Sequence, residues 1–287
     1  MRKLLLLLLV LSTSVQAEPL IWNVEKGGLR YTIIGSVHVG DKSMYPLPEI
    51  IFYRLKASQG LIVETDIRQN SGITYPPTTL LAKDVLSQGL QDELRGISNL
   101  LELNGNELLH TPPWAAALAI QMRQIEYLGY SAADGVDVKL AYKASSLGKN
   151  VLSLESLQFQ IDLLTGQKEA GKELLVSVIE EFDHSENATH CLIESWKAGD
   201  ISKLEEFASL TQTSPEFEKS FLIDRNLDWV AKLSNPEWLP KQKGEYVIVV
   251  GTLHLLGDQS VLKLLENEDF KVTQLSESIA SNCEFKY

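Results

Sequence analysis

Short apolar runs near the two ends of the chain predict the strands of a sheet. Residues 21–24 and 29–34 lie on either side of Gly27-Gly28, an arrangement typical of two strands joined by a tight turn. Three further apolar runs, at residues 60–64, 150–155 and 245–250, indicate strands, and the first two are typical of strands buried in a covered sheet. Residues 271–275 predict a last strand.

Between these runs, apolar residues recur at helical spacing. Helices are expected over residues 45–57, 80–144, 157–231 and 261–266. The third stretch is broken near Gly166, Gly199 and residues 211–215. Thr111 is expected to cap a helix whose first turn holds two prolines. The pattern therefore places strands at both ends of the chain and a largely helical region between them.

This order of elements predicts an α/β fold. We expect a central mixed sheet built from N- and C-terminal strands, with a large helical insertion at about residues 80–240. No linker rich in Pro, Gly or Ser divides the chain. Residues 18–287 are therefore expected to form a single domain, a common size for one large domain.

Residues 1–17 have the pattern of a signal peptide. A positive start precedes an apolar run at residues 4–11, and the segment ends on the small residue Ala17. The run is shorter than the roughly 20 residues needed to cross a bilayer. We expect the mature chain to begin near Glu18, to lie in the periplasm or be secreted, and to keep no stable membrane span. A retained anchor is the alternative.

Charge and cysteine content narrow the function. The net charge is −12, and no cluster of Lys or Arg offsets it, so a nucleic-acid partner is not expected. Cys191 and Cys283 are the two cysteines. Outside the cytoplasm they would either pair and tie the C-terminal tail to a central helix, or remain as separate thiols. Their spacing does not suggest zinc.

Two strand ends repeat one pattern. Gly35 to His38 and Gly251 to His254 are both Gly-x-x-His motifs that follow an apolar pair and precede a second glycine, and the chain has only five His. Ligands bind at the carboxyl ends of strands in α/β sheets, and glycine lets another group approach the backbone closely. The two motifs are therefore predicted to form one active site. The alternative is that both are ordinary loop histidines, whose ring nitrogens are hydrogen-bonded within the protein.

Carboxylates follow two other strands. Glu64, with Asp66 two residues on, ends the run at 60–64, and Glu155 ends the run at 150–155. A carboxylate at the end of an apolar strand is solvated, paired or metal-bound. Two imidazoles and two or three carboxylates at strand ends match the ligands of a divalent-metal site. Each acid alone also fits an ordinary loop carboxylate.

Six short segments, in order along nearly the whole mature chain, carry a resemblance to a known family. They are residues 35–40 with 45–48, Glu64-Thr65-Asp66, Gly135-Val136-Asp137, Leu154-Glu155-Ser156 with Gln160, Arg225-Asn226 with Trp229, and Gly251-Thr252-Leu253-His254 with Gly257. In these motifs the chain resembles the TraB/PrgY/GumN family, which is related to the Tiki-type metalloproteases. Each motif is short, and it is their order and spacing that make the resemblance specific.

The resemblance implies a metal-dependent activity. Tiki-type relatives are described as divalent-metal-dependent proteases, and other relatives as peptide-pheromone shutdown proteins. By that analogy His38, Glu64 and His254 would be the metal or catalytic set, with Mn, Co, Zn or Fe as the cofactor. The chain has no H-E-x-x-H motif, so the mechanism of that protease class is not the template.

The resemblance also implies roles for neighbouring residues. Glu155 would be a further ligand or the base that activates water, and Arg225 would hold a substrate carboxylate or an oxyanion. Asp137 would orient a His or Arg side chain. Gly35, Gly251 and Asp66 would support the site.

The other three histidines are weaker candidates for an active site. His184 and His190 are six residues apart, so they would point in different directions on a helix, and the acidic residues around them indicate a solvated surface. His110 precedes a helix start and reads as a loop residue.

The first hypothesis is an exported metal-dependent hydrolase of peptide or other amide or ester bonds. The alternatives are a protein that sequesters a peptide or small ligand without turnover, and a metal-independent hydrolase that uses His and Glu.

Overall fold

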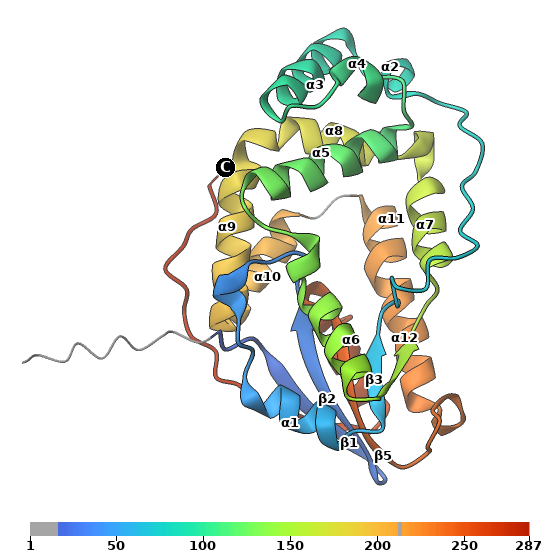
Figure 1. Cartoon of the computed structure of the whole chain (residues 1–287), viewed down its shortest axis with the longest axis vertical. Coiled ribbons are helices and arrows are strands. Elements are labelled where there is room, and N and C mark those ends of the chain that lie inside the picture. The colour runs from blue at the N-terminus through green and yellow to red at the C-terminus, as the bar shows by residue number, and fades with distance from the viewer. Residues whose placement is uncertain (1–16, 212–213, 287) are drawn as a thin grey trace, which may run out of the picture.

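A six-stranded mixed sheet occupies the lower half of the molecule in Figure 1, below a group of helices. The computed structural model describes residues 17–211 and 214–286. The strands are β1 (Ile21–Lys26), β2 (Leu29–Ser36), β3 (Gly60–Val63), β4 (Asn150–Ser153), β5 (Gly244–Gly251) and β6 (Lys271–Gln274). Their order in space is β4-β3-β5-β2-β1-β6. β1 is antiparallel to β2 and β6, whereas β2, β5, β3 and β4 run parallel to one another. The predicted α/β class with a mixed sheet is confirmed.

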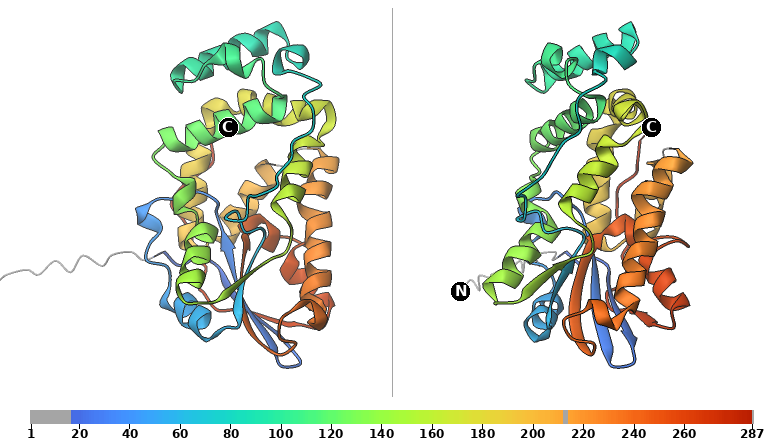
Figure 2. Two further views of the ribbon diagram at one scale, coloured as in Figure 1. Left: turned by 45° about the vertical axis from the view of Figure 1, so that its right-hand side comes forward. Right: turned by 90° about the vertical axis from the view of Figure 1, so that its right-hand side faces the viewer.

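The helices lie on both faces of this sheet and beyond the carboxyl ends of its parallel strands. They are α1 (Glu49–Ala57), α2 (Ala82–Val85), α3 (Gln88–Leu100), α4 (Gly105–Leu108), α5 (Pro113–Tyr127), α6 (Val136–Ser146), α7 (Leu157–Thr165), α8 (Lys172–Glu180), α9 (Phe182–Ala198), α10 (Ile201–Leu210), α11 (Pro215–Glu218), α12 (Asp224–Ser234) and α13 (Val261–Asn267). A π-helical turn, η4 (Lys219–Ile223), joins α11 to α12. In the right-hand view of Figure 2, α1 and α6 cover one face of the sheet, and α12 and α13 cover the other.

Burial of the strands follows from this layering. β3 and the second half of β5 are buried on both faces because helices cover both sides. β4 was predicted as a buried strand, and this is wrong: β4 is the edge strand, and its residues are half-buried or exposed. β4 also interrupts the helical interval 80–240, so the helices form one group before it and one after it.

The helices before and after β4 make a second core of their own. Buried apolar side chains of α2, α3, α5 and α8 pack together, separately from the cluster around the sheet. Thr111 does not cap α5 as predicted, because its hydroxyl donates to the carbonyl of Leu108 and Pro112 takes the N-cap position. The predicted breaks at Gly166 and Gly199 are confirmed as helix C-caps.

The two cysteines are bonded to each other. Cys191 of α9 forms a disulfide with Cys283 of the C-terminal segment, so the tail is tied to a central helix. In the described part of the chain, no helix has the length and apolar character required to cross a bilayer. The predicted signal peptide, residues 1–17, lies outside the described residues except for Ala17, and it stays a prediction together with the periplasmic or secreted location.

Candidate functional site

Four parallel strands bring their carboxyl ends to one edge of the sheet, and the main candidate residues lie there. β2 leads to His38, β3 to Glu64, β4 to Glu155, and β5 to His254 in a short 3-10 turn, Thr252–Leu255. This is the edge at which open α/β sheets bind ligands. The four strand ends meet as the sequence predicts.

The two Gly-x-x-His motifs pack directly against each other. A Cβ atom on Gly35 would lie 2.7 Å from Oγ1 and 3.2 Å from the Cα of Thr252, so a glycine is required for this approach. The hydroxyl of Thr252 then donates to the carbonyl of Ser36, at 3.0 Å. Trp196 fixes the same turn from α9, since its indole N–H donates to the carbonyl of Gly35 at 2.9 Å.

Gly251 forms the floor between the candidate ligands. A Cβ atom there would lie 3.1 Å from Glu64 Oε1, 3.5 Å from His254 Cδ2 and 3.7 Å from His38 Nε2. The backbone N–H of Gly251 donates to Glu64 Oε1 at 2.6 Å. The missing side chain therefore leaves a small cradle on which both imidazoles and the carboxylate converge.

Arg225 of α12 joins the two carboxylates. Its Nη2 donates to Glu64 Oε2 at 2.7 Å and to Glu155 Oε1 at 2.6 Å, and its Nε donates to Glu155 Oε2 at 3.1 Å. Its Nη1 donates to the carbonyl of Phe221 at 2.9 Å and faces His254 Nε2 at 3.1 Å. All five N–H donors of the guanidinium are thus matched.

Both carboxylate oxygens of Glu155 also have all their hydrogen-bond positions filled. Oε1 also accepts from Gln160 Nε2 at 2.8 Å, and Oε2 accepts from the indole N–H of Trp229 at 3.0 Å. In this arrangement neither oxygen is free to take a proton from water. The contacts of Glu155 fix the position of Arg225, whose guanidinium also lies over the Trp229 ring, 4.7 Å from its centroid.

His254 is buried and neutral. Burial lowers its pKa, the charge of Arg225 adds to this effect, and the pKa falls to about 4 despite the opposing charge of Glu64. Asn226 Nδ2 donates to the carbonyl of Gln259, so its Oδ1 is left to accept from His254 Nδ1, at 2.6 Å. The proton therefore sits on Nδ1, and the Nε2 lone pair faces Arg225 and Glu64. Sequence reasoning did not assign this role to Asn226, although the Arg-Asn pair marked its position.

His38 lies at the open side of the same cleft. Its side chain is 62% exposed, and its Nδ1 is 3.3 Å from Asp137 Oδ2, at the start of α6. Desolvation by the protein groups around the cleft would lower its pKa, but the hydrogen bond to Asp137 and the charge of Glu64 outweigh this effect and raise the pKa to about 9. Asp137 is thus placed beside a histidine, and the orienting role that the resemblance implies stays a prediction. Its Oδ1 is buried and has no hydrogen-bond partner among the described residues.

Glu64 is the ionised centre of the cluster. Burial raises its pKa, but the charges that His254 and His38 carry when protonated, the charge of Arg225 and the N–H of Gly251 outweigh burial and bring the pKa to about 2. Its side chain is 8% exposed, so its negative charge is held almost entirely by protein groups.

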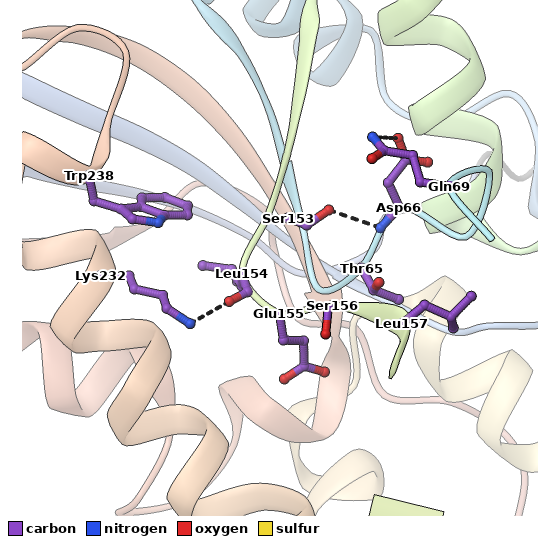
Figure 3. A pocket seen from close by; sticks show the side chains of 10 residues that line it. All are labelled: Thr65, Asp66, Gln69, Ser153, Leu154, Glu155, Ser156, Leu157, Lys232 and Trp238. Carbon is purple, nitrogen blue, oxygen red and sulfur yellow. Dashed lines mark hydrogen bonds between the residues drawn. The ribbon is translucent and has the colours of Figure 1, made fainter. Parts of the chain in front are cut away.

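Asp66 does not join this cluster. Its carboxylate pairs with Arg68, with Oδ1 2.6 Å from Nε and Oδ2 2.7 Å from Nη2. Figure 3 shows Asp66 beside Gln69, on the other side of a polar cavity of about 450 Å³ from Glu155. Asp66 contacts the site only through the backbone, because its N–H donates to the hydroxyl of Ser153 at the end of β4.

A second cavity, of about 630 Å³, opens directly onto the cluster. His38, Arg225, Gly251 and His254 line its floor, and most of its walls are apolar side chains of α9, α10, α11 and η4. Clefts that combine apolar walls with a few converging polar groups are the usual form of ligand sites.

The His and Glu side chains at the cluster are of the types that bind divalent cations, but their spacing in this structure does not form a metal site. His254 Nε2 and Glu64 Oε1 are 4.0 Å apart, and both lie at the Gly251 cradle with His38 Nε2. Within residues 17–211 and 214–286, however, no three His, Cys, Asp or Glu side chains are gathered closely enough to hold a metal ion as they stand. The Nη1 group of Arg225 takes the lone pair of His254 that a cation would need.

The other histidines lie outside the cleft. His190 Nδ1 is 2.7 Å from the hydroxyl of Tyr130, and its Nε2 is 4.0 Å from Glu186, as expected of a helix-surface pair. His110 is exposed, with its Nδ1 2.7 Å from the carbonyl of Asn106.

Comparison with known proteins agrees with the motif pattern. The chain is 28% identical over 243 residues to the uncharacterized protein YbaP of Escherichia coli (strain K12), covering 83% of this chain and 89% of that protein. It is also 28% identical over 237 residues to the protein of the same name in Shigella flexneri, covering 81% and 86%. No solved structure matches the chain. The model of the TraB/PrgY/gumN family matches residues 20–274, and the chain belongs to that family.

Proposed function

We propose that the chain is a hydrolase of peptide or other amide bonds, with its active site at the Gly251 cradle. The observation that carries the proposal is the matched setting of the two imidazoles. Asp137 faces Nδ1 of His38 and Asn226 faces Nδ1 of His254, so each ring turns its Nε2 toward the cleft beside Glu64, where that of His254 also faces Arg225 Nη1. Such orientation through the far nitrogen is common to catalytic and metal-binding histidines.

The surrounding groups support hydrolysis at this place. Four of the five Arg225 donors hold Glu64, Glu155 and the carbonyl of Phe221, and the fifth, which faces His254 Nε2, is the one that could donate to a substrate oxygen without loss of those contacts. A donor held in this way stabilises negative charge that develops on a carbonyl oxygen. The adjoining 630 Å³ cavity gives the rest of the substrate an apolar surface.

We further propose that His38, Glu64 and His254 hold a divalent cation, Mn, Co, Zn or Fe. Two imidazoles and a carboxylate are ligands that these metals accept, and the Gly251 cradle leaves room beside them. A bound cation would supply Lewis-acid polarisation of the substrate carbonyl. Arg225 must release His254 Nε2 for this to occur. That contact favours a second candidate, a metal-independent hydrolase in which His38 and Glu64 transfer protons.

Elemental analysis together with a hydrolysis screen tests these proposals. The native protein is expected to contain about one divalent metal per chain, and His38→Ala and His254→Ala are expected to lose both metal and activity. His110→Ala is the matched control, because His110 is exposed and lies outside the cleft. Hydrolysis that persists in metal-free protein and is lost in His38→Ala would support the metal-independent candidate. A metal-free protein whose His38 and His254 variants match the wild type would refute the hydrolase.

A further inference from the structure

The larger cavity has aromatic and aliphatic walls that no other part of the described chain covers. Its apolar lining consists chiefly of Leu192, Phe207, Ala208, Phe217, Phe221 and Leu222. All six are only half-buried. α11 and η4 contain no fully buried residue at all. Apolar side chains left half-buried around one hollow indicate a binding surface.

The geometry of η4 directs this wall toward the site. The π-helical turn places Phe221 so that its ring stacks on Phe217, with centroids 4.0 Å apart, while its carbonyl accepts from Arg225. π-Helical turns are rare and occur often at functional sites. The same short segment thus lines the apolar cavity with the ring of Phe221 and contacts the charged cluster with its backbone.

At the floor of the cavity lies a polar atom without a partner. Ser36 is 2% exposed, its hydroxyl oxygen has no hydrogen-bond partner among the described residues, and it lines the cavity beside His38. Buried hydroxyls almost always have a partner. After a small rotation of the Ser36 side chain, a polar group of a bound molecule, placed next to the proposed reacting atoms, would provide one.

We infer that the cavity binds a large apolar side chain of a peptide substrate, next to the bond that is cleaved. This inference rests on the proposed function and names its substrate class. The apolar side chain would contact Phe207, Phe217 and Phe221, and the peptide backbone would lie at Ser36 and His38. Burial of a phenylalanine or leucine side chain in such a cavity favours it over a serine by about 10- to 100-fold in kcat/KM.

The charges at the cavity favour a peptide over a fatty acid. Glu205 and Glu218 line it, with Glu205 exposed, and the positive charge of Arg225 is already matched by Glu64 and Glu155. A free carboxylate would be repelled by these acids, and the two cationic groups that line the cavity, Arg225 and His38, are already paired with Glu64, Glu155 and Asp137. A neutral or basic residue next to the apolar one is therefore expected in the substrate.

The test uses two uncharged pentapeptides that differ only at the central residue, phenylalanine or serine, each flanked by alanines and blocked at both ends. Ala208→Phe places a ring inside the cavity. Leu210→Phe is the matched control, because Leu210 lies on the same helix, is 41% exposed and does not line the cavity. Both variants, and Ala208→Leu as a milder filler, are compared by thermal unfolding before kcat/KM and calorimetric binding are measured.

The wild type is expected to prefer the phenylalanine peptide by at least about 10-fold. Ala208→Phe or Ala208→Leu should remove most of this preference, and Leu210→Phe should keep it. Cleavage of both peptides at equal rates would overturn the inference and leave the hydrolase intact. Selective binding of the phenylalanine peptide without cleavage, lost in Ala208→Phe, would support the cavity and count against the hydrolase. A preference that survives both fillers, or tighter binding of dodecanoate than of the peptide, would also overturn it.

Discussion

Replacing Arg225 by methionine removes the cation that bridges the two buried carboxylates of the cluster. The side chains of Arg225, Glu64 and Glu155 are 9%, 8% and 4% exposed. The change deletes five hydrogen bonds and leaves two carboxylates facing each other in a poorly solvated place. Breaking a buried ion pair from one side costs about 3–5 kcal/mol. For a domain of this size the loss corresponds to a fall in Tm of roughly 6–20 °C.

The pH dependence of this loss identifies its cause. The pKa of Glu64 is lowered from 4.5 to about 2 in the folded protein. Ionised Glu64 therefore contributes stability that is fully present above its unfolded pKa of 4.5 and is lost as the pH falls toward 2. Without Arg225 the carboxylates are less well paired when ionised. The deficit of Arg225→Met should be largest at pH 7 and shrink at pH 4.

Thermal unfolding followed by circular dichroism at both pH values measures the effect. Arg95→Met is the matched control, since Arg95 is 38% exposed and pairs with the exposed Asp92, a contact worth at most about 1 kcal/mol. The double variant Arg225→Met with Glu155→Gln should be more stable than Arg225→Met alone, because one unpaired charge is gone. A deficit below about 1 kcal/mol, or one that is equal at pH 7 and pH 4, would refute the reasoning.

Three further outcomes are expected. Gly251→Ala puts a Cβ atom 3.1 Å from Glu64 Oε1, so the carboxylate must move, and hydrolysis should fall about 100-fold while Tm changes little; unchanged hydrolysis would show that the cradle is not the site. Asp200 caps α10 and accepts from Ser281 N; burial opposes its ionisation, but these hydrogen bonds outweigh burial and lower its pKa. Ionised Asp200 therefore stabilises the fold above pH 3.8, and this contribution is lost as the pH falls further. Asp200→Ala should lower the free energy of unfolding by about 1–2 kcal/mol at pH 7 and by less in acid. Acid titrations of both proteins measure this difference. Reduction of the Cys191–Cys283 bond, which spans 92 residues, should lower stability by about 2–4 kcal/mol in denaturant titrations, and an unchanged midpoint would contradict this.

The sequence predicted the sheet and the meeting of the two Gly-x-x-His motifs for one physical reason. An apolar run that ends at a glycine marks both a buried strand and the place where its backbone can be approached closely. Gly35 against Thr252 and Gly251 against Glu64 are such approaches. Because β2 and β5 are parallel neighbours, their two His residues had to emerge at the same edge.

What the sequence did not predict depends on contacts between distant segments. The spacing of residues 150–155 does not reveal that β4 is at the edge of the sheet, since a strand of that length looks the same in either place. Glu155 and Arg225 are 70 residues apart, and only the contacts of α12 with Leu154 and Glu155, just after β4, show that the two side chains are paired. Asp66 was predicted to support the site, but Arg68, two residues on, takes both of its oxygens.

The most direct test of the central claim is hydrolysis of a defined peptide library, read by mass spectrometry, with purified wild-type protein and with His38→Ala. His38 is 62% exposed and so can be removed with little effect on folding. The account predicts cleavage at a restricted set of bonds by the wild type, and a loss of at least about 100-fold in a His38→Ala variant with an unchanged Tm. No cleavage by the wild type, or equal cleavage by both proteins, would contradict it.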